Sequence, residues 1–355
     1  MFGRLGLTAF GGPAAHIAMM HREIVERRRW LDEVQFMDMV GVTNVIPGPS
    51  STELAMQIGR TRAGWRGLVI AGLAFTLPAA LIVLGFAWAY VRFGRTPSGE
   101  AILYGTKPVV VMIVTQAVVK LTRVILNDRL LWVVAIASVA AYLLGLHELA
   151  ILAVGAALVF AARHVRSGDV ASPMFLLSIA EVDASELVRI LGVFLKVGAL
   201  LFGSGYVLLA FLERDLVDRL GLITQRELLD AIAVGQFTPG PVFTTATFVG
   251  YLIAGLPGAA VASIGIFLPS FLLVALVAPL AARARERPAT AALLDGINAA
   301  SLGLMAAVTL VLSRTAIFDL PTVVLALIAA VLLWRTKVNS AWLVIGAAGL
   351  GLLMR

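Results

Sequence analysis

The sequence Asn44-Val45-Ile46-Pro47-Gly48-Pro49-Ser50-Ser51-Thr52-Glu53 interrupts a long apolar region with two prolines, a glycine and a run of polar side chains. Proline removes a backbone donor and its ring clashes with the preceding turn, so a continuous helix cannot easily cross this stretch. One helix must therefore end there and another must begin. A second copy lies downstream in a similar apolar setting, Gln236-Phe237-Thr238-Pro239-Gly240-Pro241-Val242-Phe243-Thr244-Thr245.

The composition around these two breaks is that of a membrane protein. Of the 355 residues, 60% are hydrophobic and only 14% are charged, which excludes an ordinary soluble protein. Uncharged apolar stretches such as 67–91 and 257–282 exceed the roughly 18 residues that mark a membrane-spanning helix. The chain is therefore predicted to be an all-α polytopic membrane protein, with the lipid bilayer as its partner. Its net charge of +7 reports orientation in the membrane and not binding to nucleic acid.

The chain is also an internal repeat. A displacement of 192 residues places Pro47-Gly48-Pro49 on Pro239-Gly240-Pro241, and after one deletion a displacement of 191 carries the match through to Asp128 on Asp319. Chance identity between apolar segments aligns leucines, not prolines, aspartates and arginines. We expect a first repeat over 1–164, a polar cytoplasmic linker over 165–187 and a second repeat over 188–355.

Each repeat is predicted to contain the same parts in the same order. A short glycine-containing helix comes first, over about 2–20 and 188–212, and a charged connector follows, over 21–32 and 213–224. The broken element has arms over 33–46 and 50–59 in the first repeat, and over 225–238 and 242–251 in the second. The longer apolar helices cover 65–92, 101–122, 130–146 and 148–163, then 257–281, 291–313, 318–334 and 338–354.

The length of the arms and the charges of the loops predict the topology. Arms of this length reach only ~15–21 Å at ~1.5 Å per residue, about half to two-thirds of the hydrocarbon core, so each pair can enter the membrane and return. In the first repeat, loops on one side hold eight Lys and Arg against two on the other. In the second repeat the equivalent counts are two and five. By the positive-inside rule this reversal favours two inverted-topology repeats, with about ten transmembrane helices and two re-entrant Pro-Gly-Pro hairpins. A broken helix that spans fully would instead give parallel repeats, which most of the charge bias opposes; Arg214 and Arg219, on the outer side, weaken this argument.

The broken elements are the candidate binding site. Inverted repeats with discontinuous helices place a substrate site near the midplane, and helix N-termini with their unpaired N–H groups attract anions. The predicted binding residues are Asn44, Pro47, Gly48, Pro49, Ser50, Ser51 and Thr52 in the first copy, and Gln236, Pro239, Gly240, Pro241, Thr244 and Thr245 in the second. This donor-rich set suits a small inorganic oxyanion and needs no metal. The alternative is that Pro-Gly-Pro only kinks a helix whose Ser and Thr residues cap it.

Charged residues within the apolar segments have two interpretations each. Arg4 and Lys196 align, and each is either a counter-charge for the substrate or a side chain that reaches outward to the interface. Glu53 has no acidic counterpart in the second repeat and is either a proton carrier or the partner of Arg4 or Lys107. Asp38 and Asp230 align, and each is a coupling candidate or a structural ion pair.

These motifs resemble those of a known family. Phe10-Gly11-Gly12-Pro13 with the first Pro-Gly-Pro stretch, and Phe202-Gly203-Ser204-Gly205 with the second, are similar to the paired motifs of the chromate transporter (CHR) family in its long, two-domain form. The resemblance covers almost the whole chain. It implies an inner-membrane transporter that exports chromate, with oxyanions such as sulfate as competitors, and two antiparallel homologous halves.

Three classes of function remain to be compared. The first is a secondary transporter that works by alternating access, and no Walker loop is present that would make ATP the direct driver. The second is an oxyanion channel, or a transporter of a different small anion. The third, an intramembrane enzyme, lacks support, because the four histidines fit no catalytic or metal-binding motif and there are no cysteines. The sequence thus predicts no enzyme and no cofactor, and leaves open whether the chain forms a homodimer.

Overall fold

The computed structural model describes residues 1–9, 12–43, 46–164, 185–201, 208–276, 288–336 and 338–354. Within these ranges all regular structure is helical, in agreement with the predicted all-α class. Asn44, the Phe10-Gly11 pair, residues 202–207 and most of the predicted linker lie outside the described residues. The predicted connectors correspond to two π-helices, η1 (Arg22–Arg27) and η3 (Glu213–Arg219).

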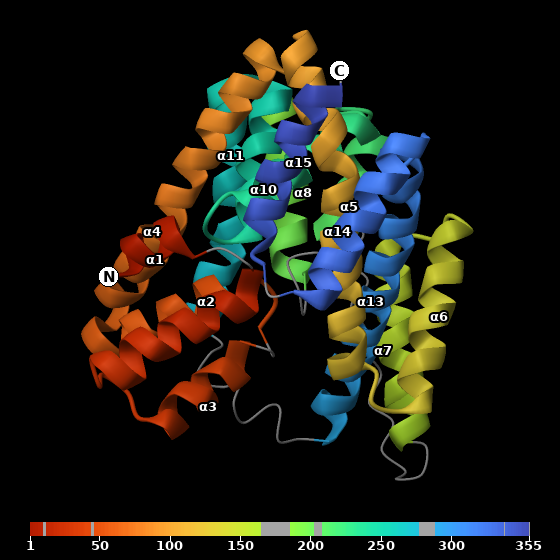
Figure 1. Ribbon diagram of the computed structural model, residues 1–355. Coiled ribbons are helices and arrows are strands. Elements are labelled where there is room, and N and C mark those ends of the chain that lie inside the picture. Colours follow the sequence, from red (N-terminus) through yellow and green to blue (C-terminus); the bar gives the residue numbers. More distant parts are fainter. Residues whose placement is uncertain are drawn as a thin grey trace.

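The helices of the two halves match one another along the chain (Figure 1). The first half contains α1 (Phe2–Thr8), α2 (Gly12–His21), α3 (Glu33–Thr43), α4 (Ser50–Phe93), α5 (Pro97–Ile125), α6 (Arg129–Leu143) and α7 (Glu148–His164). The second contains α8 (Glu186–Leu200), α9 (Leu208–Leu212), α10 (Gln225–Phe237), the 3₁₀ turn η4 (Val242–Thr244), α11 (Thr245–Leu276), α13 (Pro288–Ala316), α14 (Leu320–Arg335) and α15 (Ser340–Met354).

The local backbone conformation also repeats between the two halves. α4 is kinked at Gly64, with φ 57° and ψ −142°, and α11 is kinked at the aligned Gly255, with φ 60° and ψ −146°. Positive φ favours glycine at both positions. Asp128 caps α6 by accepting from Leu131 N, and the aligned Asp319 caps α14 in the same way. Sequence identities at these positions therefore mark repeated backbone geometry.

The prediction of one continuous first helix in each repeat is wrong, because the structure has two helices there. α1 ends at Thr8 and α2 begins at Gly12, and likewise α8 ends at Leu200 and α9 begins at Leu208. In the first half the reason lies in Gly11-Gly12-Pro13, since glycine weakens a helix and proline is tolerated only in its first turn. Each half thus has two breaks.

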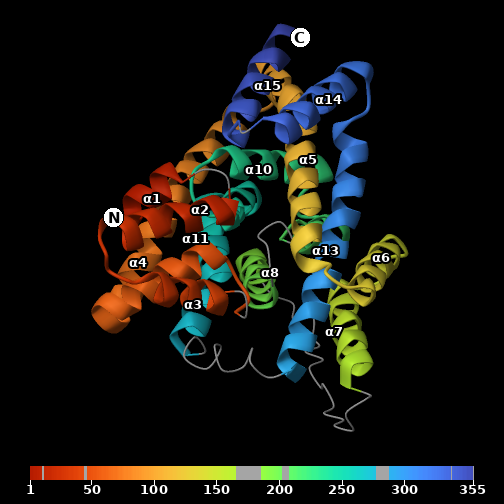
Figure 2. The same cartoon turned by 60° about the horizontal axis from the view of Figure 1, so that its bottom comes forward.

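The halves are intertwined through two long helices, α5 and α13. α5 packs mainly on α14 and α15 of the other half, while the equivalent α13 packs on α6 and α7. Glycines make these crossings close: a Cβ on Gly105 of α5 would meet the Ala347 carbonyl of α15, and one on Gly296 of α13 would meet the Gly155 carbonyl of α7. Small residues at such crossings let helix backbones approach within a membrane. Figure 2 shows α14 and α15 at the top of the view, and α6 and α7 at the lower right.

Equivalent helices run in opposite directions in the view. In Figure 1, α5 begins at the top beside the end of α4, whereas α13 begins at the bottom. In the described residues four helices are long and apolar enough to cross a membrane: 50–93, 97–125, 242–276 and 288–316. The 15-residue α6 and α15 reach only ~22 Å, so they are shorter than the ~30 Å hydrocarbon core. The chain is a multi-pass membrane protein.

Candidate functional site

The two Pro-Gly-Pro turns are held by hydrogen bonds that cross between the halves. Gly48 N donates to Leu201 O over 2.8 Å, and Gly240 N donates to Ala9 O over 2.9 Å. The acceptors, Leu201 and Ala9, are the C-cap residues directly after α8 and α1. Each Pro-Gly-Pro turn is therefore fixed by the end of the other half's first helix. The two turns and the ends of the two first helices thus lie close together.

Between these turns lies a small cavity onto which two helix starts open. Pro49, Ser50 and Ser51 line it from the beginning of α4, and Pro241, Val242 and Phe243 line it from η4, which leads into α11. His16 of α2 completes the lining. The first N–H groups of a helix have no partner within the helix and carry about half a positive charge together. Each half therefore presents the positive end of a helix to the cavity.

Buried hydroxyl groups surround the two helix starts. Ser51 is 2% exposed, Thr52 is fully buried, and Thr244 and Thr245 are each 1% exposed. Thr244 donates to Pro241 O over 2.8 Å, while the Thr52 and Thr245 hydroxyls have no hydrogen-bond partner among the described residues. A buried polar group without a partner costs ~1–3 kcal/mol, so these positions can gain from a ligand.

The other predicted members of the site lie around this cavity. Pro239, Gly240 and Pro241 are buried, as is Gln236 near the end of α10, whereas Pro47 is only half-buried. The backbone of Gly48 and Gly240 has φ of 137° and 95°, values that residues with a Cβ rarely adopt. Glycine at the centre of each turn is thus a requirement of the backbone.

Glu53 is the exception to the repeat symmetry. It is fully buried in the first turn of α4, and neither carboxyl oxygen has a hydrogen-bond partner among the described residues. Neither partner proposed from the sequence is present, because Arg4 pairs with Glu23 and Lys107 pairs with Asp230.

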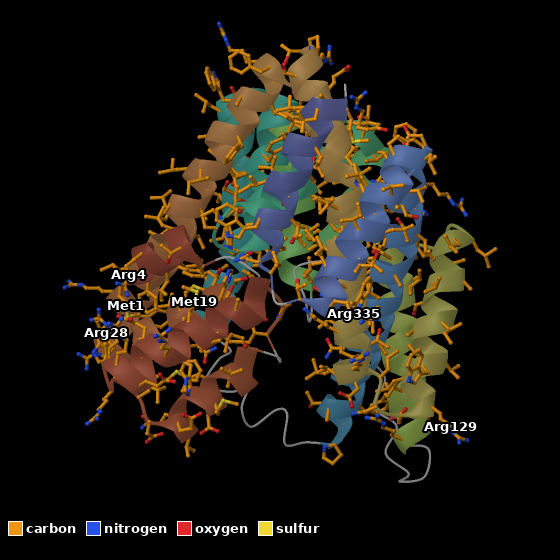
Figure 3. All side chains as sticks on the ribbon, viewed as in Figure 1. Met1, Arg4, Met19, Arg28, Arg129 and Arg335 are labelled. Atoms are coloured by element: carbon orange, nitrogen blue, oxygen red, sulfur yellow. The ribbon has the colours of Figure 1, made fainter. Side chains whose placement is uncertain are left out.

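Arg4 and Lys196 occupy equivalent ion pairs away from the cavity lining. Arg4 contacts Glu23 at 3.2 Å with its side chain 62% exposed, and Figure 3 shows it at the left edge of the view near Arg28. The Lys196 side chain is 8% exposed and contacts Glu148 at 3.1 Å and also Asp215, the residue aligned with Glu23. Both cations tie a first helix to a connector, and the structure does not bring them to the cavity.

The connector carboxyl that receives Arg4 is held as an anion. The hydrogen bond from Arg28, with further contributions from Arg27 and Arg4, holds the pKa of Glu23 below its usual range. The positive side chains that crowd this connector are thereby matched with an acid.

Asp38 and Asp230 align in sequence but differ in environment. Asp38 is exposed on α3, whereas Asp230 is fully buried on α10. Lys107 Nζ lies 3.0 Å from Asp230 Oδ1, and Tyr90 donates to Asp230 Oδ2 over 2.8 Å. Lys107 is 7% exposed and is paired with this acid. Asp230 therefore joins α10 to α4 and α5.

Besides Val242 and Phe243, two further residues at the turns escaped the sequence-based prediction. His16 lines the cavity and its Nε2 lies 3.0 Å from Ala9 O, the acceptor of the Gly240 hydrogen bond. Ser270 of α11 is fully buried, lies against Gly48 and has no hydrogen-bond partner for its hydroxyl among the described residues. The position of His16 three residues after Pro13 was a usable signal, whereas nothing in the sequence marks Ser270.

Comparison with known proteins places the chain in one family. The chromate transporter family model matches residues 1–160 and 188–352, once for each half. The chain is 36% identical to the chromate transport protein of Cupriavidus metallidurans, over 99% of this chain and 91% of that protein. It is 34% identical to a probable chromate transport protein of Synechococcus elongatus, over 94% and 88% of the two chains.

Further relatives include a chromate transport protein of Pseudomonas aeruginosa, which is 33% identical over 98% of this chain and 89% of that protein. No solved structure matches the chain. Both halves match the family model, and the relatives align over nearly their whole lengths. The chain belongs to the chromate transporter family, in its long form with two matching segments.

Proposed function

We propose that this protein exports chromate across the inner membrane by alternating access, and that it binds the anion between the two Pro-Gly-Pro turns. The observation that carries the proposal is a cavity onto which the starts of α4 and of η4–α11 both open. Positive helix ends from two sides match a dianion that has no apolar face. Relatives named as chromate transport proteins support the choice of anion.

The binding residues comprise Ser50 and Ser51 of the predicted set, together with two residues of the second half that were not in that set. Ser50 and Ser51 supply hydroxyl and backbone donors from one half, and Val242 and Phe243 supply backbone donors from the other. Thr52 and Thr245, buried behind them, offer hydroxyls that the described residues leave unpaired. Each hydrogen bond to a charged group contributes ~1.5–3 kcal/mol, so a few of them can replace the hydration of the oxyanion. Sulfate has the same shape and charge and is the expected competitor.

Alternating access follows from two inverted repeats around one fixed site. The opposite directions of α5 and α13, the reversed charge of the loops and the crossed hydrogen bonds at the turns support the inverted arrangement. The proposed units are residues 1–164 and 188–355, with about ten crossings and two re-entrant hairpins. Outward movement needs no ATP, because an inside-negative potential of 100 mV favours the efflux of a dianion by about 4.6 kcal/mol.

Flux of labelled chromate into proteoliposomes tests this function. We expect saturable uptake above that of empty liposomes, inhibition by sulfate and faster flux when the potential attracts the anion. Absence of saturable chromate flux with the purified wild-type protein would contradict the proposal.

The second candidate is an oxyanion channel that uses the same cavity without alternation. A carrier moves labelled chromate faster when unlabelled chromate is present on the opposite side, because the loaded form reorients. A channel shows no such acceleration. The small size of the cavity and the crossed hydrogen bonds that hold both turns favour the carrier.

A further inference from the structure

Two buried polar groups at the first Pro-Gly-Pro turn have no role in the site described above. A Cβ built on Gly48 would collide with both Glu53 Oε1 and Ser270 Oγ, so the carboxyl and the hydroxyl approach the same glycine. Both residues are fully buried, and none of these oxygens has a hydrogen-bond partner among the described residues. Unpaired oxygens at such depth indicate that something binds there.

The pair exists in only one half. The residues aligned with Glu53 and Ser270 are Thr245 and Ala79, and a Cβ on Gly240 would meet the Ala79 side chain instead of a polar side chain. Packing of the turn therefore does not need a carboxyl, since the second turn has a threonine and an alanine at the aligned positions. One chain holds one such site.

The carboxyl of Glu53 lies where it competes with an anion. Glu53 belongs to the same first helical turn as Ser50 and Ser51, which line the cavity, and its N–H donates to Pro49 O over 3.1 Å. A carboxylate here and an oxyanion in the cavity would share the positive end of α4. Two like charges at close range in a dry site disfavour each other strongly.

The cations on surrounding elements are engaged elsewhere. Lys107 of α5 pairs with Asp230 of α10, and Lys196 of α8 pairs with Glu148 and Asp215. Arg4 of α1 pairs with Glu23. Arg60, further along α4, donates to the Val274 and Ala275 carbonyls at the end of α11, the element that carries Ser270. Among the described residues that line the cavity, the titratable group is His16 of α2, whose Nε2 lies 3.0 Å from Ala9 O.

We propose that Glu53 takes up one proton when the oxyanion binds, so that one proton and one anion cross the membrane together. This inference rests on the proposed function. The carboxylate becomes a carboxylic acid, which removes its repulsion of the anion, and Ser270 supplies the adjacent hydroxyl to which it can hydrogen-bond. When the anion leaves, the acid releases its proton to the same side. A dianion then moves with a net charge of −1 instead of −2.

Proteoliposomes containing the wild-type protein test the coupling. Both compartments are kept alkaline enough for chromate to remain a dianion, sodium is absent, and valinomycin with equal potassium holds the voltage at zero. We expect the side with more chromate to be the more alkaline one, because the anion follows the proton inward from an acidic exterior. A gradient of one pH unit drives an accumulation of about tenfold at equilibrium.

Glu53→Gln and a matched control test whether Glu53 is the residue that carries the coupled proton. The Glu53→Gln protein should exchange chromate at equal pH but lose the accumulation driven by the pH gradient. Glu186→Gln, the same change at an exposed position in the first turn of α8, should accumulate chromate like the wild type. If Glu53→Gln fails to exchange at all, Ser270→Ala decides: the pH at which its exchange is half-maximal must shift from that of the wild type, and an unshifted profile overturns the proposal.

Other outcomes would overturn the proposal and leave the oxyanion site in place. These are wild-type exchange without any response to pH, accumulation on the acidic side, accumulation driven by sodium instead, or coupling that survives in Glu53→Gln, which would leave His16 as the carrier. Absence of exchange in the wild type at equal pH would instead contradict the proposed function itself. The two failures are therefore distinguishable.

Discussion

Gly48 has φ of 137°, in the left-handed region, and its amide hydrogen is used in the hydrogen bond to Leu201 O. A side chain at this position has no free space, because its Cβ would collide with Ser270 and Glu53. Gly240 likewise has a positive φ, of 95°, although the side chain that a Cβ would meet there is that of Ala79. The requirement for glycine thus comes from the backbone and from packing at once, and at Gly48 the packing partners are the proposed proton-binding pair.

Gly48→Ala should abolish chromate transport. The strain of positive φ costs ~1–2 kcal/mol, and the clash displaces the carboxyl of Glu53. Flux in proteoliposomes is the measurement. Gly85→Ala is the control, because Gly85 lies within α4 and a Cβ there meets nothing within 4 Å. Equal loss in both variants would show that α4 tolerates no added methyl group, and would contradict a special role for the turn.

Ser51→Ala should weaken the apparent affinity for chromate by about 10- to 100-fold, because one hydrogen bond to a charged ligand is lost. The half-saturating chromate concentration in exchange assays measures the effect. Ser98→Ala, which removes an exposed hydroxyl in the first turn of α5, is the matched control and should behave as the wild type. An unchanged affinity in Ser51→Ala would remove this hydroxyl from the site.

Among the helices, both halves share a close approach of the first helix to the kinked helix, of α1 to α4 and of α8 to α11. A Cβ on Gly6 of α1 would collide with the Phe75 carbonyl of α4, and one on Gly198 of α8 would collide with the Ile266 carbonyl of α11. Both members of the first contact align in sequence with those of the second. The contacts position Ala9 and Leu201 to accept the crossed hydrogen bonds from the turns.

Gly198→Ala should destabilise the protein by ~1–3 kcal/mol, as expected for overpacking against backbone. Gly192→Ala, in the same helix, is the control, because a Cβ on Gly192 meets nothing within 4 Å. Thermal unfolding in detergent compares them. A Gly192→Ala variant that is as unstable as Gly198→Ala would show that α8 responds to helix composition and not to the contact.

Asp230→Asn should destabilise the protein by ~3–5 kcal/mol, because it leaves Lys107 charged, buried and without its acid. Lys107→Met combined with Asp230→Leu should recover most of the loss, since no unpaired charge remains. Thermal unfolding measures both variants, with Asp38→Asn as the exposed counterpart. A double variant no better than Asp230→Asn would mean that the ion pair itself, and not the unpaired charge, sets the stability.

Much of this arrangement could be predicted from the chain alone. Apolar length predicted the membrane helices, and the displaced match of Pro-Gly-Pro, Asp128 and Asp319 predicted repeated geometry that the turns and caps display. The second break in each half was missed, because an apolar stretch with glycines was interpreted as one helix. The partners of Lys107 and Lys196 were also missed. Ion pairs such as Lys107–Asp230, far apart along the chain, depend on tertiary packing, which periodicity does not specify.

The whole molecule consists of two halves that cannot be separated without exposing their crossings. Each long helix, α5 or α13, is packed against the last two helices of the other half, and each Pro-Gly-Pro turn is hydrogen-bonded to the other half. The halves differ at several polar residues: Glu53, Ser270 and Lys107 align with residues of another kind, and the buried Asp230 aligns with the exposed Asp38. A nearly symmetric scaffold thus surrounds a site whose two sides differ chemically.

Single cysteines should report the inverted arrangement, and the chain is suited to them because it contains none of its own. Ser98→Cys and Ala289→Cys lie at equivalent positions in the first turns of α5 and α13. A thiol reagent that does not cross membranes should modify them from opposite sides, and the cysteine-free wild type should stay unlabelled. Labelling of both from one side would indicate parallel repeats.

The most direct test of the anion site is a crystal structure of the protein with chromate, using the anomalous scattering of chromium to locate the ion. The account predicts one anomalous peak between the two turns, within hydrogen-bonding distance of Ser50 or Ser51 on one side and of the Val242 or Phe243 backbone on the other. A peak elsewhere, for example beside Lys196 with nothing between the turns, would contradict it.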